Sequence, residues 1–354
     1  MPSNKLAPIR RSLLHWYDTA HRDMPWRRTR DPYAIWIAET MLQQTQVTTV
    51  VPYYDKFLNA FPTARALDRA PLCKVLALWS GLGYYRRAEN LKKSARQIVA
   101  QHRGRLPADY KTLLSLPGVG AYTAGAVMSI AFGARYPALD GNARRVLGRM
   151  FNIDGEKELR ERAARLVPKL RPGYFNQGLM ELGATICLPR IPKCHACPVA
   201  GFCAARRAGQ LSSRVAPGAS RNVTGVFWPM AIVRSRGKVL LRRRPNDGIL
   251  RGLWEFPGGE KRWHEDLQAM LRRHLAEFNA ALQCHGRIAQ IRHSITNKRI
   301  LSPIVLFDVR RPGPIALPGS RWRWVSLSSL RRLPVSSMTL KAASVLAGYE
   351  KNLS

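Results

Sequence analysis

Four of the six cysteines lie in one short segment, and this clustering constrains the fold more than any other feature of the chain. Their spacing is Cys187-x6-Cys194-x2-Cys197-x5-Cys203. Four thiolates spaced in this way can hold a [4Fe–4S] cluster. A tetrahedral zinc site is the alternative, although zinc ribbons usually carry two close cysteine pairs with a longer spacer. We therefore expect residues 187–203 to form a loop that binds one [4Fe–4S] cluster.

The chain has 46% hydrophobic residues but no run of 18 apolar residues, so we expect no membrane span. Residues 1–14 have no apolar core of signal-peptide length. These features predict a cytoplasmic protein in a reducing compartment, where cysteines bind metals or stay as thiols. The two isolated cysteines, Cys73 and Cys284, are expected to be buried and unreactive.

Charge indicates a polyanionic partner. Lys and Arg total 58 against 22 Asp and Glu, a formal net charge of +36. Such an excess favours nucleic acid, because Lys and Arg displace counterions from phosphates. A ribosome-associated or merely basic protein is the alternative. We find no basic amphipathic helix with a dedicated apolar face, which argues against a membrane surface. We expect a DNA-binding, nucleoid-associated monomer.

The first half of the chain reads as helices joined by short turns, up to about residue 185. Asp31-Pro32 is a helix start signal, and the spacing of apolar residues predicts a helix over Tyr33–Val51. Leu91–His102 is amphipathic and Gly104 supplies a stop. We assign residues 1–203 to one mainly α domain that includes the cysteine loop.

The second half reads as a smaller α+β domain. Residues 204–224 are rich in Ala, Gly, Ser and Arg and are expected to form a linker, followed by a domain over residues 225–350. The expected elements are a hairpin of Val226–Val233 with Val239–Leu241 around Arg236-Gly237, a strand over 254–259, a helix over 263–279 and a strand over 304–309.

Two glycine turns open onto helices. In Leu116-Pro-Gly-Val-Gly120, the backbone N–H groups near Gly118 and Gly120 can hold a phosphate, although such a turn also simply joins helices. In Leu139-Asp-Gly-Asn142, Asp140 is either a helix N-cap or a functional carboxylate.

Glu39 has unusual neighbours. A lone Glu among apolar residues is usually on a solvated helix face or paired with a cation. Here it is followed by uncharged donors and acceptors suited to reading base edges: Gln43, Gln44, Thr45 and Gln46. Trp26 and Arg27 supply a stacking plane and a cation just upstream. The pattern indicates a site for a nucleobase.

Taken together, these motifs resemble the MutY adenine DNA glycosylases of the helix-hairpin-helix superfamily, to which endonuclease III belongs. The resemblance covers about residues 10–205, and the second half is more loosely similar to the Nudix-like recognition domain of that family. The motifs are Met24-Pro-Trp-Arg27, Glu39-Thr-Met-Leu-Gln-Gln-Thr-Gln-Val47, Gly81-Leu-Gly-Tyr-Tyr85, Leu116–Gly120, Leu139–Asn142 and the four cysteines.

The resemblance implies roles for individual residues. Glu39 falls at the catalytic acid and Asp140 at the second catalytic carboxylate. Tyr122 matches a tyrosine that supports the transition state, with Asn142 beside Asp140 in its motif. Gln44 and Tyr84 match residues that wedge into the duplex. Positions of the adenine pocket are matched by Arg22, Trp26, Arg27 and Gln177. The cluster ligands are matched by Cys187, Cys194, Cys197 and Cys203.

The implied reaction is hydrolysis of the glycosidic bond of adenine mispaired with 8-oxoguanine or guanine, as a step of base-excision repair. A carboxylic acid that protonates N7 must have a raised pKa, and a second carboxylate must face the cationic sugar. The two-carboxylate logic is that of glycoside hydrolysis. The base must first be flipped out of the duplex.

One difference from strand-cutting relatives decides the reaction subtype. Endonuclease III carries a Schiff-base lysine just after the glycine hairpin, where this chain reads Ala121-Tyr122-Thr123. The nearest preceding lysine is Lys111, before the hairpin. We therefore predict a monofunctional glycosylase that leaves an abasic site.

The second half departs from two family patterns. Phe256-Pro-Gly-Gly259 is kept, but the glutamates with which Nudix hydrolases bind Mg²⁺ are missing, so we expect a DNA-binding domain and no pyrophosphatase. The Phe-Ser-His loop that reads 8-oxoguanine is replaced by Ile295-Thr296-Asn297. Thr296 and Asn297 are expected to hydrogen-bond the damaged base; an ordinary polar turn is the alternative.

Two other functions fit part of the pattern. An endonuclease III-type enzyme for oxidised pyrimidines shares the hairpin and cysteines, but it requires lysine where Tyr122 stands. A non-catalytic iron–sulfur redox sensor on DNA accounts for charge and cysteines, but it leaves Glu39 and Asp140 without a role.

Overall fold

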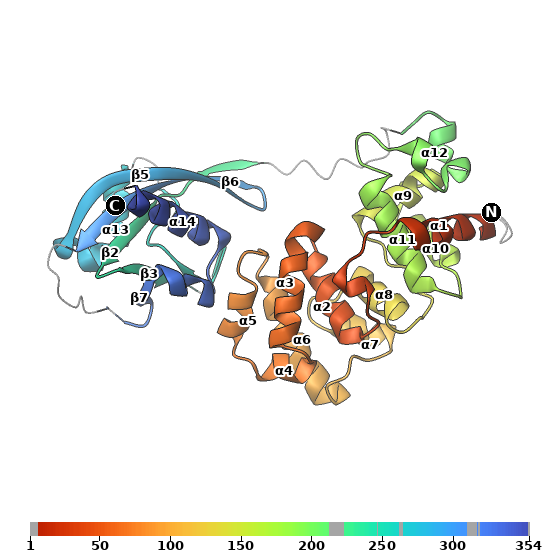
Figure 1. The fold of residues 1–354 in the computed structure, drawn as a ribbon, viewed down its shortest axis with the longest axis horizontal. Helices are drawn as coiled ribbons and strands as arrows, with labels where there is room; N and C mark the ends of the chain where they lie inside the picture. The colour runs from red at the N-terminus through yellow and green to blue at the C-terminus, as the bar shows by residue number, and fades with distance from the viewer. Residues whose placement is uncertain are drawn as a thin grey trace. The chain divides into compact units, whose positions relative to one another are not determined.

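The computed structural model describes residues 6–211, 223–245, 247–261, 265–309, 317 and 319–352. Two compact units are present (Figure 1): a helical unit of Met1–Ala70 with Glu89–Ser220, and a mixed-sheet unit of Pro71–Ala88 with Arg221–Ser354. Most of the expected linker, residues 212–222, lies outside the described residues. Among the described residues, no helix is long and apolar enough to cross a bilayer.

The helical unit consists of helices joined by turns, as the sequence predicts. Helices α1, α9, α10 and α11 share one apolar core, and Figure 1 shows them gathered together. The helices are α1 (Ala7–Ala20), η2 (Pro25–Arg27), α2 (Pro32–Leu42), α3 (Val47–Ala60), α4 (Ala64–Arg69), α6 (Arg86–His102), α7 (Tyr110–Ser115), α8 (Ala121–Ile130), α9 (Gly141–Phe151), α10 (Glu156–Leu166), α11 (Pro172–Thr185), η3 (Cys194–Ala196), η4 (Ala200–Phe202) and α12 (Ala204–Arg207).

Helix α2 begins where the Asp-Pro signal predicts. The Asp31 carboxylate accepts hydrogen bonds from the backbone N–H groups of Tyr33 and Ala34, at 3.2 and 3.1 Å, and Pro32 occupies the first turn. Every residue of α2 from Tyr33 to Met41 is buried, so this helix lies inside the unit and carries Glu39 with it.

The single helix expected over Tyr33–Val51 is wrong, because the chain breaks between Leu42 and Val47. Gln44 adopts a left-handed conformation there, with φ of 57°, which an α-helix cannot contain. The predicted stop after α6 is confirmed: the N–H of Gly104 donates to the carbonyl of Ile98 at 3.0 Å, and Gly104 has φ of 79°.

The mixed-sheet unit begins with α5 (Leu72–Leu78). The hydroxyls of Ser80 and Tyr85 both donate to the Val335 carbonyl, at 2.6 and 2.8 Å, which ties Pro71–Ala88 to this unit. The remaining elements are β1 (Thr224–Phe227), β2 (Met230–Ser235), β3 (Lys238–Arg243), β4 (Trp254–Glu255), α13 (Leu267–His274), η5 (Ala276–Ala281), β5 (Leu282–Ile295), β6 (Lys298–Val309), β7 (Trp322–Ser326), η6 (Leu327–Arg332) and α14 (Ser337–Lys351).

Within the described residues the strands form one seven-stranded mixed sheet, in the order β1-β6-β2-β3-β4, with β5 on β6 and β7 on β3. Helix α14 packs on one face and α13 on the other. Both faces of β2 are buried, because Ile232 enters the α14 core while Ala231 and Val233 enter the α13 core.

The predicted hairpin is confirmed in its turn and wrong in its first strand. Arg234 pairs with Val239 around Arg236-Gly237, and both turn residues have positive φ, as a two-residue hairpin turn requires. The first strand is broken at Trp228-Pro229 into β1 and β2. The other predicted elements are shifted: β4 is shorter than expected, α13 begins at Leu267, and β6 begins at Lys298.

Candidate active site

A cavity of about 510 Å³ lies in the helical unit, where α2, α8, α9 and α11 meet the segment around η2. This is the size range of small-molecule sites. Its lining includes eleven of the residues predicted from the sequence: Arg22, Trp26, Arg27, Glu39, Gln43, Gln44, Thr45, Tyr122, Asp140, Asn142 and Gln177. Residues separated by more than 150 positions in the chain thus line one cavity.

Glu39 is a buried carboxyl in the last turn of α2, with 4% of its surface exposed. Its Oε2 accepts a hydrogen bond from the hydroxyl of Tyr122, in the first turn of α8. The pKa of Glu39 is raised to about 7: burial is the main cause and the nearby Asp140 adds to it, while Tyr122 and Arg27 act against the rise. Glu39 can therefore hold a proton at neutral pH.

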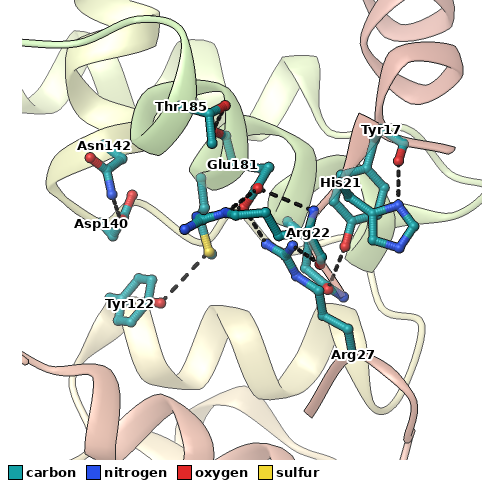
Figure 2. Close-up of polar contacts among 11 residues, drawn as sticks. Tyr17, His21, Arg22, Arg27, Tyr122, Asp140, Asn142, Glu181 and Thr185 are labelled. Carbon is teal, nitrogen blue, oxygen red and sulfur yellow. Dashed lines mark hydrogen bonds and ion pairs between the residues drawn. The ribbon is translucent and has the colours of Figure 1, made fainter. Parts of the chain in front are cut away.

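Asp140 is the N-cap of α9, which is one of the two roles expected from the sequence, and it also lines the cavity. Its Oδ1 accepts from the N–H of Ala143 at 2.7 Å, and its Oδ2 accepts from Nδ2 of Asn142 at 3.0 Å (Figure 2). Burial raises the pKa of Asp140, whereas these hydrogen bonds and Arg145 act against the rise. The donors and the helix N-terminus favour the carboxylate form.

A chain of hydrogen bonds leads from Asp140 to the cysteine loop. Asn142 accepts at Oδ1 from Nη2 of Arg145 at 2.8 Å, and Nε of Arg145 donates to the carbonyl of Cys187 at 2.8 Å. Arg145 also donates to the carbonyl of Gly183 at 2.7 Å. The position of Asp140 is therefore tied to the first cysteine of the loop.

Sequence reasoning missed Glu181, which lines the same cavity and is 1% exposed. Figure 2 shows Arg22 and Arg27 converging on its carboxylate. The Nε of Arg22 donates at 2.6 Å and Nη2 of Arg27 donates at 2.8 Å. The available signal was position, because Glu181 follows Gln177 by one helical turn on α11.

The two glycines of the predicted phosphate-binding turn join α7 to α8. Gly118 has φ of 79°, and a Cβ there would lie 2.8 Å from Nδ2 of Asn90, so only glycine fits. A Cβ on Gly120 would meet nothing within 4 Å, so the backbone at the start of α8 is open to an approaching group.

The remaining predicted DNA contacts lie in the mixed-sheet unit. Tyr84 is 40% exposed and has φ of 47°. Thr296 and Asn297 form the turn between β5 and β6, where Ile295 pairs with Lys298, and Thr296 has φ of 53°. A β-branched residue with positive φ is rare and strained.

The four clustered cysteines lie near one another in the loop that follows α11. Burial raises the pKa of Cys197 to about 11, and the other three thiols of the cluster add to this effect. Arg149, 1% exposed, donates to Sγ of Cys187 at 3.4 Å and to the carbonyl of Leu188 at 2.7 Å. Four thiols beside a buried guanidinium suit an anionic iron–sulfur group. Cys73 and Cys284 are exposed, so their predicted burial is wrong.

A second cavity, of about 520 Å³, lies in the mixed-sheet unit and is lined by basic side chains. Arg242 and Arg244 in its wall form ion pairs at 3.1 and 2.9 Å with Glu255, which is 2% exposed. Glu260 lines the cavity and pairs with Lys298. Among the described residues, no three His, Cys, Asp or Glu side chains are placed to hold a single metal ion.

Comparison with known proteins agrees with this site. Residues 37–169 match the HhH-GPD superfamily base excision DNA repair protein family, and residues 229–344 match the NUDIX domain family. The adenine DNA glycosylase of Rattus norvegicus is 34% identical over 97% of this chain and 78% of its own length. The adenine DNA glycosylase of Homo sapiens is 34% identical over 98% of this chain and 75% of its own length.

Among solved structures, a thermostable thymine-DNA glycosylase is 37% identical, with a TM-score of 0.55, over 58% of this chain and 98% of that one. The adenine DNA glycosylases of Rattus norvegicus and Homo sapiens match both units of the chain, whereas the thymine-DNA glycosylase matches only part of it. The chain belongs to the adenine DNA glycosylases of base-excision repair, in the HhH-GPD superfamily, with a C-terminal NUDIX domain.

Proposed function

We propose that this glycosylase removes adenine paired with 8-oxoguanine or guanine in duplex DNA and leaves an abasic site without cutting the strand. The observation that carries the proposal is the cavity that contains both Glu39 and Asp140. Burial raises the pKa of Glu39 so that it can carry a proton near neutral pH, while Asp140 accepts hydrogen bonds that favour its carboxylate. Hydrolysis of a glycosidic bond requires one protonated and one ionised carboxyl of this kind.

In the proposed mechanism Glu39 is the general acid. Its proton passes to N7 of the flipped adenine, which converts a poor anionic leaving group into a neutral base. Tyr122 donates a hydrogen bond to Glu39 and so stabilises the carboxylate that remains after transfer. General acid catalysis of this kind contributes typically about 10²- to 10⁴-fold.

Asp140 is proposed to face the sugar as the bond to adenine breaks. The departing base leaves an oxocarbenium-like cation, which an adjacent carboxylate stabilises electrostatically or by transient bonding before water adds. Asn142 orients Asp140 through its 3.0 Å hydrogen bond. The described residues that line the cavity include no lysine, which supports a reaction without a Schiff base.

Four side chains are proposed to form the adenine pocket: Arg22, Trp26, Arg27 and Gln177. Trp26 is buried and stacks edge-on against Tyr54, with ring centroids 5.5 Å apart, so its plane is fixed before the base arrives. Gln43 is oriented by donation to Oγ1 of Thr123 at 3.1 Å, and Gln43 and Thr45 are assigned to base-edge contacts.

Gln44 and Tyr84 are proposed to enter the duplex when the base leaves it, and Gly118 and Gly120 to contact a phosphate. Gln44, Tyr84 and Thr296 are all non-glycine residues with positive φ. Backbone strain of this kind costs of order 1–3 kcal/mol and concentrates at functional sites. We assign Thr296 and Asn297, at the tip of the β5–β6 turn, to the base opposite adenine.

The domains are assigned accordingly. Residues 1–203 carry the chemistry, residues 204–224 form a linker, and residues 225–350 bind DNA around the lesion. Cys187, Cys194, Cys197 and Cys203 are proposed to hold one [4Fe–4S] cluster. Such a group would fix the fold of the loop that Arg149 and Arg145 join to α9, and we assign it no part in bond cleavage.

The test is single-turnover cleavage of duplexes that carry adenine opposite 8-oxoguanine, adenine opposite guanine, adenine opposite thymine, and thymine glycol. We expect the fastest adenine release opposite 8-oxoguanine, slower release opposite guanine and none from the other two. Release of thymine glycol would favour the endonuclease III-type reaction, and binding without release would favour a non-catalytic sensor.

Borohydride added during turnover distinguishes hydrolysis of the glycosidic bond from a reaction that passes through a Schiff base. A monofunctional enzyme forms no Schiff base, so reduction should trap little protein on DNA, while an endonuclease III enzyme in the same assay serves as the positive control. Efficient trapping would overturn the assignment of a hydrolytic mechanism.

A further inference from the structure

Glu181 connects the two arginines of the proposed adenine pocket. Its Oε1 accepts from Nε of Arg22 at 2.6 Å and from the backbone N–H of Arg22 at 3.3 Å. Its Oε2 accepts from Nη2 of Arg22 at 3.0 Å and from Nη2 of Arg27 at 2.8 Å. A fork-shaped pair of this kind fixes the planes of both groups.

The same carboxylate fixes the backbone of the segment that carries the arginines. Nη1 of Arg27 donates to the carbonyl of Arg22 at 2.8 Å, which closes a ring of contacts through Glu181 (Figure 2). The guanidinium of Arg27 also lies over the ring of Tyr17, 5.4 Å from its centroid, and Tyr17 donates to Oε1 of Gln177 at 2.8 Å. Three of the predicted pocket residues therefore depend on one network.

The charges of the cavity wall balance only when Glu181 is ionised. Its described lining has two cations, Arg22 and Arg27, and three acidic groups, Glu39, Asp140 and Glu181. With Glu39 protonated, two carboxylates face two guanidiniums. Without Glu181 the wall would carry an excess positive charge, while the reaction places a positive charge first on the protonated base and then on the sugar.

We propose that Glu181 is a positioning residue of the active site, which holds Arg22 and Arg27 against the adenine pocket and cancels their charge beside the reacting nucleotide. The inference rests on the proposed role of Glu39 as the proton donor. Glu181 itself touches neither the base nor the sugar in this account. It acts by positioning the two arginines and by reducing the positive electrostatic potential that they create in the cavity.

The charged and titratable groups around the two carboxyls define the expected pH effect. Glu39 is faced by Tyr122 from α8, Asp140 from the start of α9 and Arg27 from η2. Glu181 is faced by Arg22, Arg27 and Tyr17, and burial of its carboxyl is outweighed by the two guanidiniums, which lower its pKa. It therefore stays ionised while Glu39 carries a proton.

The experiment compares wild type and Glu181→Gln in single-turnover adenine release across mildly acid to mildly alkaline pH. The amide keeps the shape of the side chain but leaves Arg22 and Arg27 uncompensated. We expect the pKa that governs the rate to fall by about one unit. Because Glu39 titrates near neutrality, the rate at neutral pH should fall about five-fold and recover in acid.

A charge-balanced double variant separates electrostatics from packing. Arg27→Gln combined with Glu181→Gln removes one charge of each sign, so its governing pKa should return toward the wild-type value even if its rate stays low. Glu181→Asp keeps the charge on a shorter side chain and should retain the wild-type pH profile. A uniform loss of rate in Glu181→Gln, with an unshifted profile, would overturn the proposal.

Glu255→Gln is the matched control, because Glu255 is also buried and also pairs with two arginines, but in the other unit. It should leave the pH profile of adenine release unchanged. Folding of each variant is checked by circular dichroism and by thermal unfolding. Glu39→Gln, run in parallel, tests the proton donor itself: if that variant stays active, the proposed acid is wrong, whatever Glu181 does.

Discussion

The two cavities of this chain are nearly equal in volume, about 510 Å³ in the helical unit and about 520 Å³ in the mixed-sheet unit, but within the described part of the chain the two proposed catalytic carboxyls of the first lack the ion pairs of the buried glutamate beside the second. Among the described residues, neither Glu39 nor Asp140 forms an ion pair with Lys or Arg. Under the second cavity, the buried Glu255 is paired with both Arg242 and Arg244.

The comparison shows how surroundings decide what a buried glutamate does. A buried carboxyl that forms no ion pair keeps its proton toward neutrality, as Glu39 does, and can give that proton to a substrate. A carboxyl between two guanidiniums forms ion pairs that hold the surrounding side chains in place, although burial still raises the pKa of Glu255. Glu181 is of this second kind although it lies in the same cavity as Glu39.

The largest expected effect comes from Glu39→Gln. An amide of the same shape has no acidic proton, so single-turnover adenine release should fall by about 10²- to 10⁴-fold. Binding to a duplex with adenine opposite 8-oxoguanine, measured by fluorescence anisotropy, should change little. Glu255→Gln should keep wild-type chemistry in its folded fraction. If Glu39→Gln is as active as wild type, Glu39 is not the proton donor, and its role does not differ from that of Glu255 in the way proposed.

Eleven residues that line the active-site cavity could be predicted from the sequence, some from local patterns and others, such as Tyr122 and Gln177, only from the resemblance to the MutY family. Asp140 follows a helix-capping pattern, and Glu39 stands out as an acid in an otherwise apolar helix. Glu181 could not be found in this way. Its partners Arg22 and Arg27 lie 159 and 154 positions away in the chain, so no pattern of neighbouring residues marks these ion pairs.

The mixed-sheet unit was harder to predict, because its longest strand breaks the expected periodicity. The pairing of β5 with β6 shifts register between Cys284 and Gly286 and again between Arg287 and Ala289, so apolar residues do not alternate regularly. The break after α2 could not be predicted either, because Gln44 adopts a positive φ at a position where a glycine would usually indicate such a conformation.

The dependence of protein stability on pH gives a second test of the difference between Glu39 and Glu255. The folded pKa of Glu39, about 7, lies above its ordinary value of 4.5. The folded state thus binds this proton more tightly, and that stabilisation is present below pH 4.5 and lost as pH rises through 7. The whole loss corresponds to about 3 kcal/mol.

Glu39→Gln does not titrate, so its thermal stability relative to wild type should rise between mildly acid and mildly alkaline pH. Glu255→Gln, which leaves two buried guanidiniums without their carboxylate, should instead lower the melting temperature at both pH values. Differential scanning fluorimetry of the three proteins measures this. Parallel curves for Glu39→Gln and wild type would contradict a raised pKa for Glu39.

The smallest effect is expected at the β5–β6 turn, which adjoins Lys298 of the second cavity. Thr296 holds a strained positive φ, so Thr296→Gly should relieve strain while it removes the hydroxyl proposed to bond the damaged base. One hydrogen bond is worth about 1 kcal/mol, which predicts a roughly five-fold loss of preference for adenine opposite 8-oxoguanine over adenine opposite guanine.

Asn297→Ala should lower the same ratio without any gain in stability. The ratio is measured from single-turnover rates on the two duplexes, and since both contain the same adenine, a change in Glu39 chemistry cancels from it. If neither variant alters the ratio, the turn is an ordinary polar hairpin and recognition of the opposite base resides elsewhere in the chain.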